Sequence, residues 1–278
     1  MGKKKNAYPG VKIFKYAFLV IFSIVIIIPF YWLIASSLKN DGQFFAVPPV
    51  WVPDPPLWEN YPFVLLELKY WRFIANSIWL GAAVVLLCVT SSSFVAYGFA
   101  RFKFPGKNIL FALLLSTMML PVQVTMIPQF ILFRHLGWLN TYLPLLVPHL
   151  FGSAYIIFLL RQFFAGIPRE MDEAAKIDGC SSLLIWLWII LPQSKPALIT
   201  SALFVFMYTY KDVMAPLLYL GNQSRYTVAV AVLLFTSPNY TNFSLQFVGV
   251  ALALVPTVIF FIISQKFTDS GIQIASLK

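Results

Sequence analysis

Long stretches without a charged residue dominate the pattern of this chain. Four of them each exceed the roughly 20 residues with which a helix crosses a bilayer: Tyr16 to Leu38, Phe73 to Ala100, Asn108 to Phe133 and Tyr226 to Gln265. They show little of the alternation between apolar and polar residues that is typical of half-buried strands. Because backbone groups in hydrocarbon must form their hydrogen bonds internally, these stretches are predicted to be helices.

The hydrophobic pattern as a whole predicts an all-α integral membrane fold with six transmembrane helices. The six are about Phe14 to Ser37, Ile74 to Phe99, Ile109 to Phe133, Tyr142 to Phe164, Pro196 to Leu220 and Ser244 to Lys266. The fifth predicted helix contains two charged residues, Lys211 and Asp212. An even number of spans puts both termini on the same side of the membrane.

Composition supports the same class of protein. Hydrophobic residues make up 60% of the 278 residues and charged residues only 11%, and the mean hydropathy is +0.80. About a quarter of the residues of a soluble domain are charged. This chain therefore lacks the polar side chains that would be needed to cover a globule in water.

The distribution of positive charge predicts the orientation. With six spans, most of the 20 Lys and Arg residues lie on the side of the two termini. Because Lys and Arg are enriched in cytosolic connections, both termini are predicted to be cytosolic. The formal net charge of +10 then follows from orientation against anionic lipid, and a nucleic acid partner is not needed to explain it.

This topology divides the chain into four segments. They are a basic cytosolic N-terminus (1–15), the first span with a Pro/Trp-rich external loop (16–71), a core of five spans with a cytosolic helix at about 168–180 (72–267), and a cytosolic C-terminal tail (268–278). The loop from Val47 to Tyr61 predicts irregular backbone at the membrane surface, where Trp51 and Trp58 suit the interface.

Charges concentrate in one short stretch, Pro168 to Gly179, between the fourth and fifth predicted spans. Pro168 suits a first helical position, the acidic residues after it suit the positive end of a helix dipole, and Gly179 suits a helix end. The stretch is predicted to be a short cytosolic helix. From the residues alone, it is either a solvated amphipathic connector or a helix that docks to a cytosolic partner.

The sequence contains no pattern of catalytic or metal-ligating residues. His135 and His149 stand apart without ligand spacing, and Cys88 and Cys180 lie at different predicted depths. The glycine-rich loop that cradles phosphates in nucleotide-binding enzymes is missing. We therefore predict no metal site and no enzymatic activity in this chain.

The charged stretch resembles the EAA motif of permease subunits of ATP-binding-cassette (ABC) importers. The matching positions are Glu173-Ala174-Ala175, Asp178, Gly179, Ile189 and Leu191-Pro192. Other segments resemble the carbohydrate-type permeases, in particular the smaller permease of maltose-type importers. These segments are Asn76-Ser77, Tyr97, Ala100-Arg101, Met119 to Phe130, Leu136 to Pro148 and Gly271 to Lys278.

The resemblance implies the type I ABC importer permease fold with both termini in the cytosol. It also implies that the chain is a multi-pass protein of the inner (cytoplasmic) membrane of a bacterial or archaeal cell. It implies half of a translocation path for a sugar or related polar solute. The implied partners are a second homologous permease in a heterodimer, two copies of a cytosolic ABC ATPase that bind the ATP and Mg, and an extracytoplasmic solute-binding protein. This chain itself would need no cofactor.

Two alternatives remain open beside a sugar importer. The first is an ABC importer permease for a non-sugar solute such as a polyol, sugar phosphate, peptide or amino acid. The second is an ion-coupled secondary transporter, a class that commonly shows internal repeats and ionisable residues near the midplane. No clear repeat is found here, and only Lys211 and Asp212 qualify as such residues.

The resemblance also implies which residues couple the chain to the ATPase. These are Arg169, Glu170, Glu173, Ala174, Ala175, Asp178 and Gly179. In this interpretation Glu173 pairs with a basic residue of the ATPase, Ala174 and Ala175 line the contact, and Gly179 allows a sharp exit. The tail from Gly271 to Lys278 resembles one that reaches between the two ATPases, although it departs from the commoner glycine-rich ending.

Two further sites are predicted, one on the solute path and one in an external loop. Counting from Pro196, Lys211 lies about 22 Å along the fifth predicted helix at about 1.5 Å per residue. Lys211 and Asp212 therefore either face a watery cavity or reach the outer interface.

The segment Gly221 to Val230 resembles the external loop that meets the solute-binding protein. Its candidate contact residues are Asn222, Gln223, Arg225 and Tyr226, with an ordinary polar turn as the alternative.

Overall fold

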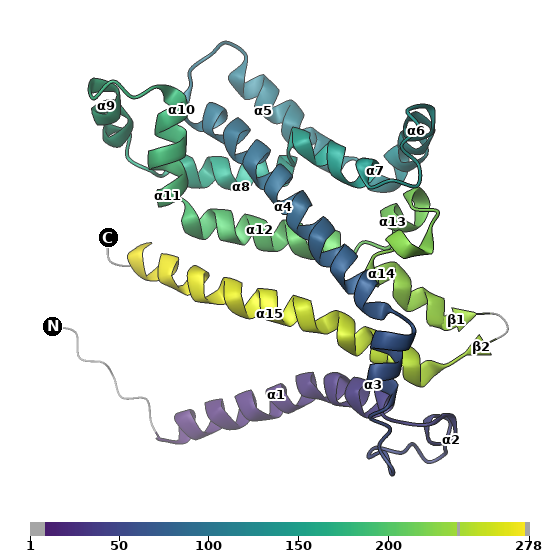
Figure 1. The fold of residues 1–278 in the computed structure, drawn as a ribbon. Coiled ribbons are helices and arrows are strands. Elements are labelled where there is room, and N and C mark those ends of the chain that lie inside the picture. The colour runs from purple at the N-terminus through teal and green to yellow at the C-terminus, as the bar shows by residue number, and fades with distance from the viewer. Residues whose placement is uncertain (1–8, 238–239, 276–278) are drawn as a thin grey trace. The chain divides into compact units, whose positions relative to one another are not determined.

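The computed structural model describes residues 9–237 and 240–275 of the chain (Figure 1). The contacts between these residues divide the chain into two units. One unit comprises residues within 1–69 and 234–252, and the other comprises residues within 70–233 and 253–278. Helices dominate both units, which confirms the predicted all-α fold.

Four helical segments of the described chain are long and apolar enough to cross a membrane. They are Phe14–Ser37, Tyr70–Arg101, Leu143–Ala165 and Phe243–Gln265. Two bent pairs of helices also qualify if each pair is counted as one span, which gives up to six spans. The six predicted spans therefore all have helical counterparts, but two of these are strongly bent. The fourth predicted helix, Tyr142 to Phe164, is interrupted at Gly152 and Ser153, where the backbone leaves the helical region.

The unit that contains residues within 1–69 begins with a long helix, α1 (Pro9–Ser37). Its other elements are α2 (Asp41–Phe44), α3 (Asn60–Pro62), the π-helix η1 (Phe63–Glu67) and the antiparallel strands β1 (Thr236–Ser237) and β2 (Tyr240–Thr241). The Val47 to Tyr61 segment is irregular up to α3, as predicted. The Ser37 hydroxyl lies 2.8 Å from the Tyr61 hydroxyl and so fixes this loop to the end of α1.

The last helix, α15 (Phe243–Ala275), continues well past the end of the sixth predicted span. The predicted tail from residue 268 is therefore helical as far as Ala275, and no helix break separates it from the span. The remaining tail residues, 276–278, lie outside the described part of the chain.

The other unit contains the remaining helices. They are α4 (Tyr70–Arg101), α5 (Lys107–Ser116), η2 (Thr117–Met119), α6 (Val122–His135), α7 (Leu143–Leu146), η3 (Val147–Phe151), α8 (Ala154–Ala165), α9 (Glu170–Ile177), α10 (Ser182–Ile185), η4 (Trp186–Ile190), α11 (Leu191–Gln193), α12 (Lys195–Tyr210), α13 (Met214–Tyr219), η5 (Gln223–Arg225), α14 (Val228–Ala231) and, at the boundary between the units, η6 (Val232–Phe235).

The third predicted span is not one straight helix. The helical segments Lys107–Met119 and Val122–His135 meet at 94°. The backbone between them is extended at Leu120 and Pro121. Because the residue before a proline is disfavoured in the helical region, Leu120-Pro121 is a natural place for the helix to break.

The fifth predicted helix, Pro196 to Leu220, is wrong at its C-terminal end. Helix α12 stops at Tyr210, and a separate helix, α13, starts at Met214. Lys211 and Asp212 therefore lie in the break between two helices and not inside a continuous span. At its other end, α12 meets the helical segment Ser182–Gln193 at 83°.

Helix α4 is the centre of this unit because both α8 and α12 pack along it. The shared core contains Val84, Leu160 and Ile190, each fully buried. Small residues on α4 allow close approach, as in membrane helix packing generally. The Ser92 hydroxyl accepts a hydrogen bond from the Ser153 backbone N–H at 2.9 Å, so the start of α8 is fixed against α4.

Candidate functional site

The predicted cytosolic helix is present as α9, a separate short helix (Glu170–Ile177) between α8 and α10 (Figure 1). Its first turn holds three acidic residues, Glu170, Asp172 and Glu173, at the positive end of the helix dipole. Pro168 lies just before the helix rather than at its first position, because Arg169 is the N-cap residue.

Gly179 ends α9 as predicted. Its φ of +83° lies in the left-handed region that glycine adopts without strain. The Gly179 N–H donates to the Lys176 carbonyl at 3.0 Å, and the Cys180 N–H donates to the Ala175 carbonyl at 2.9 Å. This pair of hydrogen bonds is a Schellman motif, which terminates the helix and turns the chain toward α10.

Helix α9 has two faces of different character. Glu170, Glu173 and Ala174 are exposed, and Ile177 is 88% exposed. Arg169, Asp178 and Gly179 are exposed as well. Six of the seven predicted coupling residues are thus on the surface of this chain, together with an exposed isoleucine that the sequence prediction missed.

Ala175 is the exception and corrects one prediction. It is only 6% exposed and belongs to the core of its own unit. It therefore packs inside this chain and does not line an external contact as Ala174 can. The physical reason is helix geometry, since Ala175 lies three residues after the buried Asp172 and so on the same side of α9.

A buried ion pair connects that inner side of α9 to α4. The Arg101 Nε lies 2.8 Å from the Asp172 Oδ2, and the two side chains are only 4% and 10% exposed. The Arg101 Nη2 also donates to the Ile167 carbonyl at 3.0 Å. Arg101 and Asp172 were not among the predicted coupling residues. The sequence did contain one signal for Asp172. It lies three residues before Ala175 on a short amphipathic helix, and this spacing places both on one side of the helix.

The predicted external loop is anchored at the other end of α4. The Asn76 side-chain amide donates to the Ser224 and Tyr226 carbonyls at 2.9 and 3.0 Å. The Ser77 hydroxyl accepts from the Val228 N–H at 2.7 Å. Asn222 and Gln223 are exposed, whereas Arg225 and Tyr226 are half-buried, so the first two are the better placed for an external contact.

Tyr142 supports the same loop. Its hydroxyl donates to the Arg225 carbonyl at 2.9 Å. This hydrogen bond joins the residue before α7 to the loop.

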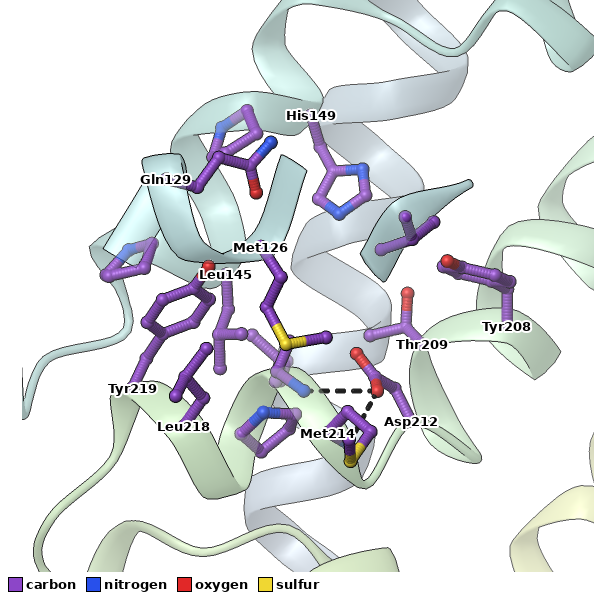
Figure 2. Close-up of a pocket in the computed structure, with 16 residues that line it drawn as sticks. Met126, Gln129, Leu145, His149, Tyr208, Thr209, Asp212, Met214, Leu218 and Tyr219 are labelled. Carbon is purple, nitrogen blue, oxygen red and sulfur yellow. Dashed lines mark hydrogen bonds between the residues drawn. The ribbon is translucent and has the colours of Figure 1, made fainter. Parts of the chain in front are cut away.

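Asp212 has a local structural role. Its Oδ1 accepts hydrogen bonds from the Met214 N–H at 3.0 Å and the Ala215 N–H at 3.3 Å, as Figure 2 shows. These are orphan N–H groups at the start of α13. The carboxylate thus caps the helix that follows the break, and it remains beside a cavity.

Two adjoining cavities lie next to this break. The smaller, of about 180 Å³, is lined by Asp212 and by residues that include Met126, Gln129 and Tyr219 (Figure 2). The larger, of about 620 Å³, is lined by Lys211 and by residues that include Ser153, Tyr155 and Phe204. His149, Tyr208 and Thr209 line both cavities.

The structure thus separates the predicted site residues into three places. The coupling residues lie on α9, the loop residues lie at the start of α4, and Lys211 and Asp212 lie beside the cavities. Within the described residues, no group of three or more His, Cys, Asp or Glu side chains is placed to hold a metal ion.

Comparison with known proteins identifies the family. The model of the family described as "binding-protein-dependent transport system inner membrane component" matches residues 89–274, a range that includes α9 and both ends of α12. The arabinooligosaccharides transport system permease protein AraQ of Halalkalibacterium halodurans is 28% identical over 91% of this chain and 92% of its own length. The sn-glycerol-3-phosphate transport system permease protein UgpE of Yersinia pestis bv. Antiqua is 30% identical over 95% of this chain and 96% of its own length.

A solved structure shows the same fold. It is a chain of a bacterial ABC transporter involved in the import of the acidic polysaccharide alginate. The TM-score is 0.82 at 20% identity, over 96% of this chain and 99% of that chain. The resemblance to ABC importer permeases that the EAA motif indicated is therefore confirmed, and this chain belongs to the family of binding-protein-dependent transport system inner membrane components, the membrane-spanning transport subunits of ABC importers.

Proposed function

We propose that this chain forms half of the translocation path of an ATP-driven importer for a saccharide or a saccharide-derived polar solute. A second, homologous permease forms the other half. Two copies of a cytosolic ATPase bind ATP and Mg, and an extracytoplasmic protein delivers the solute. The complex resides in the inner (cytoplasmic) membrane of a bacterial or archaeal cell, with both termini of this chain in the cytosol.

The observation that carries this proposal is the exposed face of α9. Glu170, Glu173, Ala174 and Ile177 present two carboxylates beside a small and a large apolar side chain. An apolar centre flanked by charges suits a protein interface. Glu173 pairs with a cation of the ATPase, and Ala174 lets the two backbones approach closely.

The cavities beside α12 support the solute class. Tyr155, Phe204 and Tyr208 offer aromatic surface, and Ser153 and Thr209 offer hydroxyl groups. A few polar groups in an aromatic wall are typical of sites for small polar organic molecules. The transport systems for which AraQ and the alginate transporter chain are named handle saccharides. We therefore assign to Lys211 and Asp212 a position along the solute path.

A second candidate solute is an anionic one, such as a sugar phosphate. Lys211 lines the larger cavity and is exposed, and the named transport system of UgpE handles sn-glycerol-3-phosphate. The solute-binding protein distinguishes the candidates. Its thermal unfolding temperature rises with the true ligand, so a panel of neutral saccharides, polyols and sugar phosphates identifies the class.

The coupling assignment is tested by Glu173→Lys in the full transporter, with a tag on this chain. The wild-type chain is expected to co-purify with an ATPase subunit, whereas the variant inserts normally but loses most of the ATPase and of the solute uptake. Glu67→Lys makes the same charge change at an exposed residue of η1 and is expected to keep both. Normal uptake by Glu173→Lys would show that α9 is not the docking helix.

A further inference from the structure

The Arg101–Asp172 pair joins two elements that are distant in sequence. Arg101 is the last residue of α4, and Asp172 lies in the first turn of α9. The guanidinium contacts both the Asp172 carboxylate and the Ile167 carbonyl, which precedes α9. The Arg101 side chain thus contacts both α9 and the segment that leads into α9 from α8.

Stability alone is a poor explanation for this arrangement. Burying two charges costs desolvation free energy that their attraction hardly recovers, and well-packed apolar residues are often at least as stabilising. The Asp172 Oδ1 is moreover buried without a hydrogen-bond partner, which adds to the cost. Because the Arg101 guanidinium contacts both the Asp172 carboxylate and the Ile167 carbonyl, it does hold α9 and the residues before it against the end of α4.

Helix α4, to which this ion pair holds α9, makes contacts at both of its ends. Asn76 and Ser77 bind the loop at residues 224–228 near one end of this helix, and Arg101 binds α9 at the other end. Asn76 and Arg101 are about 37 Å apart along a helix that rises about 1.5 Å per residue. This distance exceeds the hydrocarbon core of about 30 Å, so α4 connects the two predicted faces of the membrane directly.

We propose that Arg101 and Asp172 are positioning residues that lock α9 to α4, so that a displacement of α9 by the ATPase moves α4 with it as one rigid body. The inference rests on the proposed function, because it presupposes an ATPase docked on the exposed face of α9. The alternative is that α9 pivots at Gly179 and drives α10 while α4 stays behind. In that case the ion pair contributes only to packing.

The first test measures solute transported per ATP hydrolysed by the complete transporter in proteoliposomes. Arg101→Gln and Asp172→Asn are expected to lower this ratio roughly two- to thirty-fold, the range of coupling effects seen along packed networks. ATPase co-purification and hydrolysis are expected to persist, since the exposed face of α9 is untouched. Lys103→Gln, which removes an exposed cation two residues beyond Arg101, is the matched control and is expected to leave the ratio unchanged.

The apolar double variant, Arg101→Met with Asp172→Leu, separates positioning from packing. It replaces both buried charges by apolar side chains and leaves no buried charge without a partner, so it is expected to assemble while its transport per ATP stays low. A normal ratio in this double variant, or in both single variants, would overturn the inference. If the wild-type chain fails to bind any ATPase, the proposed function fails instead, and the two failures are thus distinguishable.

A second measurement leaves the ion pair intact. Spin labels are placed at Gly98→Cys on α4, where an added Cβ meets no atom within 4 Å, and at the exposed Lys176→Cys on α9, in a Cys180→Ser background. The distance between the labels is expected to be the same without nucleotide and with a non-hydrolysable ATP analogue. A change in this distance between the two states would show that α9 moves independently of α4 and would overturn the inference.

Discussion

Two neighbouring carboxylates of α9, Asp172 and Glu173, carry the same charge but have different surroundings. Consecutive helix residues point about 100° apart, so Asp172 faces α4 while Glu173 is exposed. Asp172 is neutralised by Arg101 inside the chain. Glu173 is available for a cation of another subunit. The EAA motif identifies the exposed carboxylate but not its buried neighbour.

Gly179 is predicted to limit how readily α9 opens locally. Its φ of +83° disfavours a side chain, yet an added Cβ would meet no atom within 4 Å. Gly179→Ala therefore adds backbone strain alone, about 1–2 kcal/mol. We expect amide hydrogen exchange in α9 to accelerate roughly five- to thirty-fold, because local opening becomes easier by that free energy.

Gly179→Asn is the comparison for this prediction, since asparagine tolerates the left-handed region better than alanine. It is expected to fall between wild type and Gly179→Ala. Equal exchange in all three proteins would show that the Schellman ending does not limit the opening of α9.

Lys211 is predicted to select the charge of the solute. Its charge lies at the edge of the larger cavity, where it attracts anions. Lys211→Gln is expected to raise the half-saturating concentration for a phosphate- or carboxylate-bearing solute by about fivefold or more, the effect of losing about 1 kcal/mol of a charge-assisted contact. Uptake of a neutral saccharide is expected to change little.

The control for this prediction is Lys195→Gln, which removes an exposed cation at the other end of α12. It is expected to leave both solutes unaffected. If Lys211→Gln leaves the uptake of anionic and neutral solutes equally unchanged, Lys211 lies off the solute path and only meets the lipid headgroups.

At the scale of elements, continuity of helices was the least predictable property. Hydropathy located the apolar segments that form the candidate spans, because it depends on local composition. It did not locate the end of α12 at Tyr210, since Lys211 and Asp212 are also compatible with a helix. The break there is stabilised by the hydrogen bonds that Asp212 makes to the first N–H groups of α13.

Close packing of α4 against α12 gives a prediction at this scale. An added Cβ at Gly81 would lie 2.8 Å from two ring atoms of Phe206. Phe206 cannot easily yield, because it is buried and its ring packs 4.4 Å from that of Phe260. We expect Gly81→Ala to lower the free energy of unfolding in detergent by about 1–3 kcal/mol, the usual cost of overpacking.

The same substitution at Gly98 serves as the control. Gly98 also lies in α4, but an added Cβ there meets no atom within 4 Å. Alanine is the better helix former by about 1 kcal/mol, so Gly98→Ala is expected to be neutral or slightly stabilising. A destabilisation as large as that of Gly81→Ala would indicate general intolerance of α4 to substitution and not a specific contact with Phe206.

At the scale of the whole molecule, the remaining prediction concerns orientation. The positive-inside rule places α9 in the cytosol and the loop at residues 221–227 outside. In right-side-out vesicles with Cys180→Ser as background, a membrane-impermeant maleimide is expected to label Asn222→Cys directly. Ile177→Cys, at an 88% exposed position, is expected to react only after permeabilisation. Labelling of both cysteines from the same side would refute the topology.

The sequence by itself determined that this chain is a helical membrane protein, which segments are apolar enough to span, and where α9 ends. These properties depend on residues close together in the chain: the length of an uncharged run, a capping glycine, a short motif at fixed spacing. Only the tertiary structure decided which side of α9 is buried, that Arg101 meets Asp172, and that Lys211 and Asp212 face two cavities. Those facts depend on contacts between helices distant in sequence, and hydropathy and local propensity carry no information about such contacts.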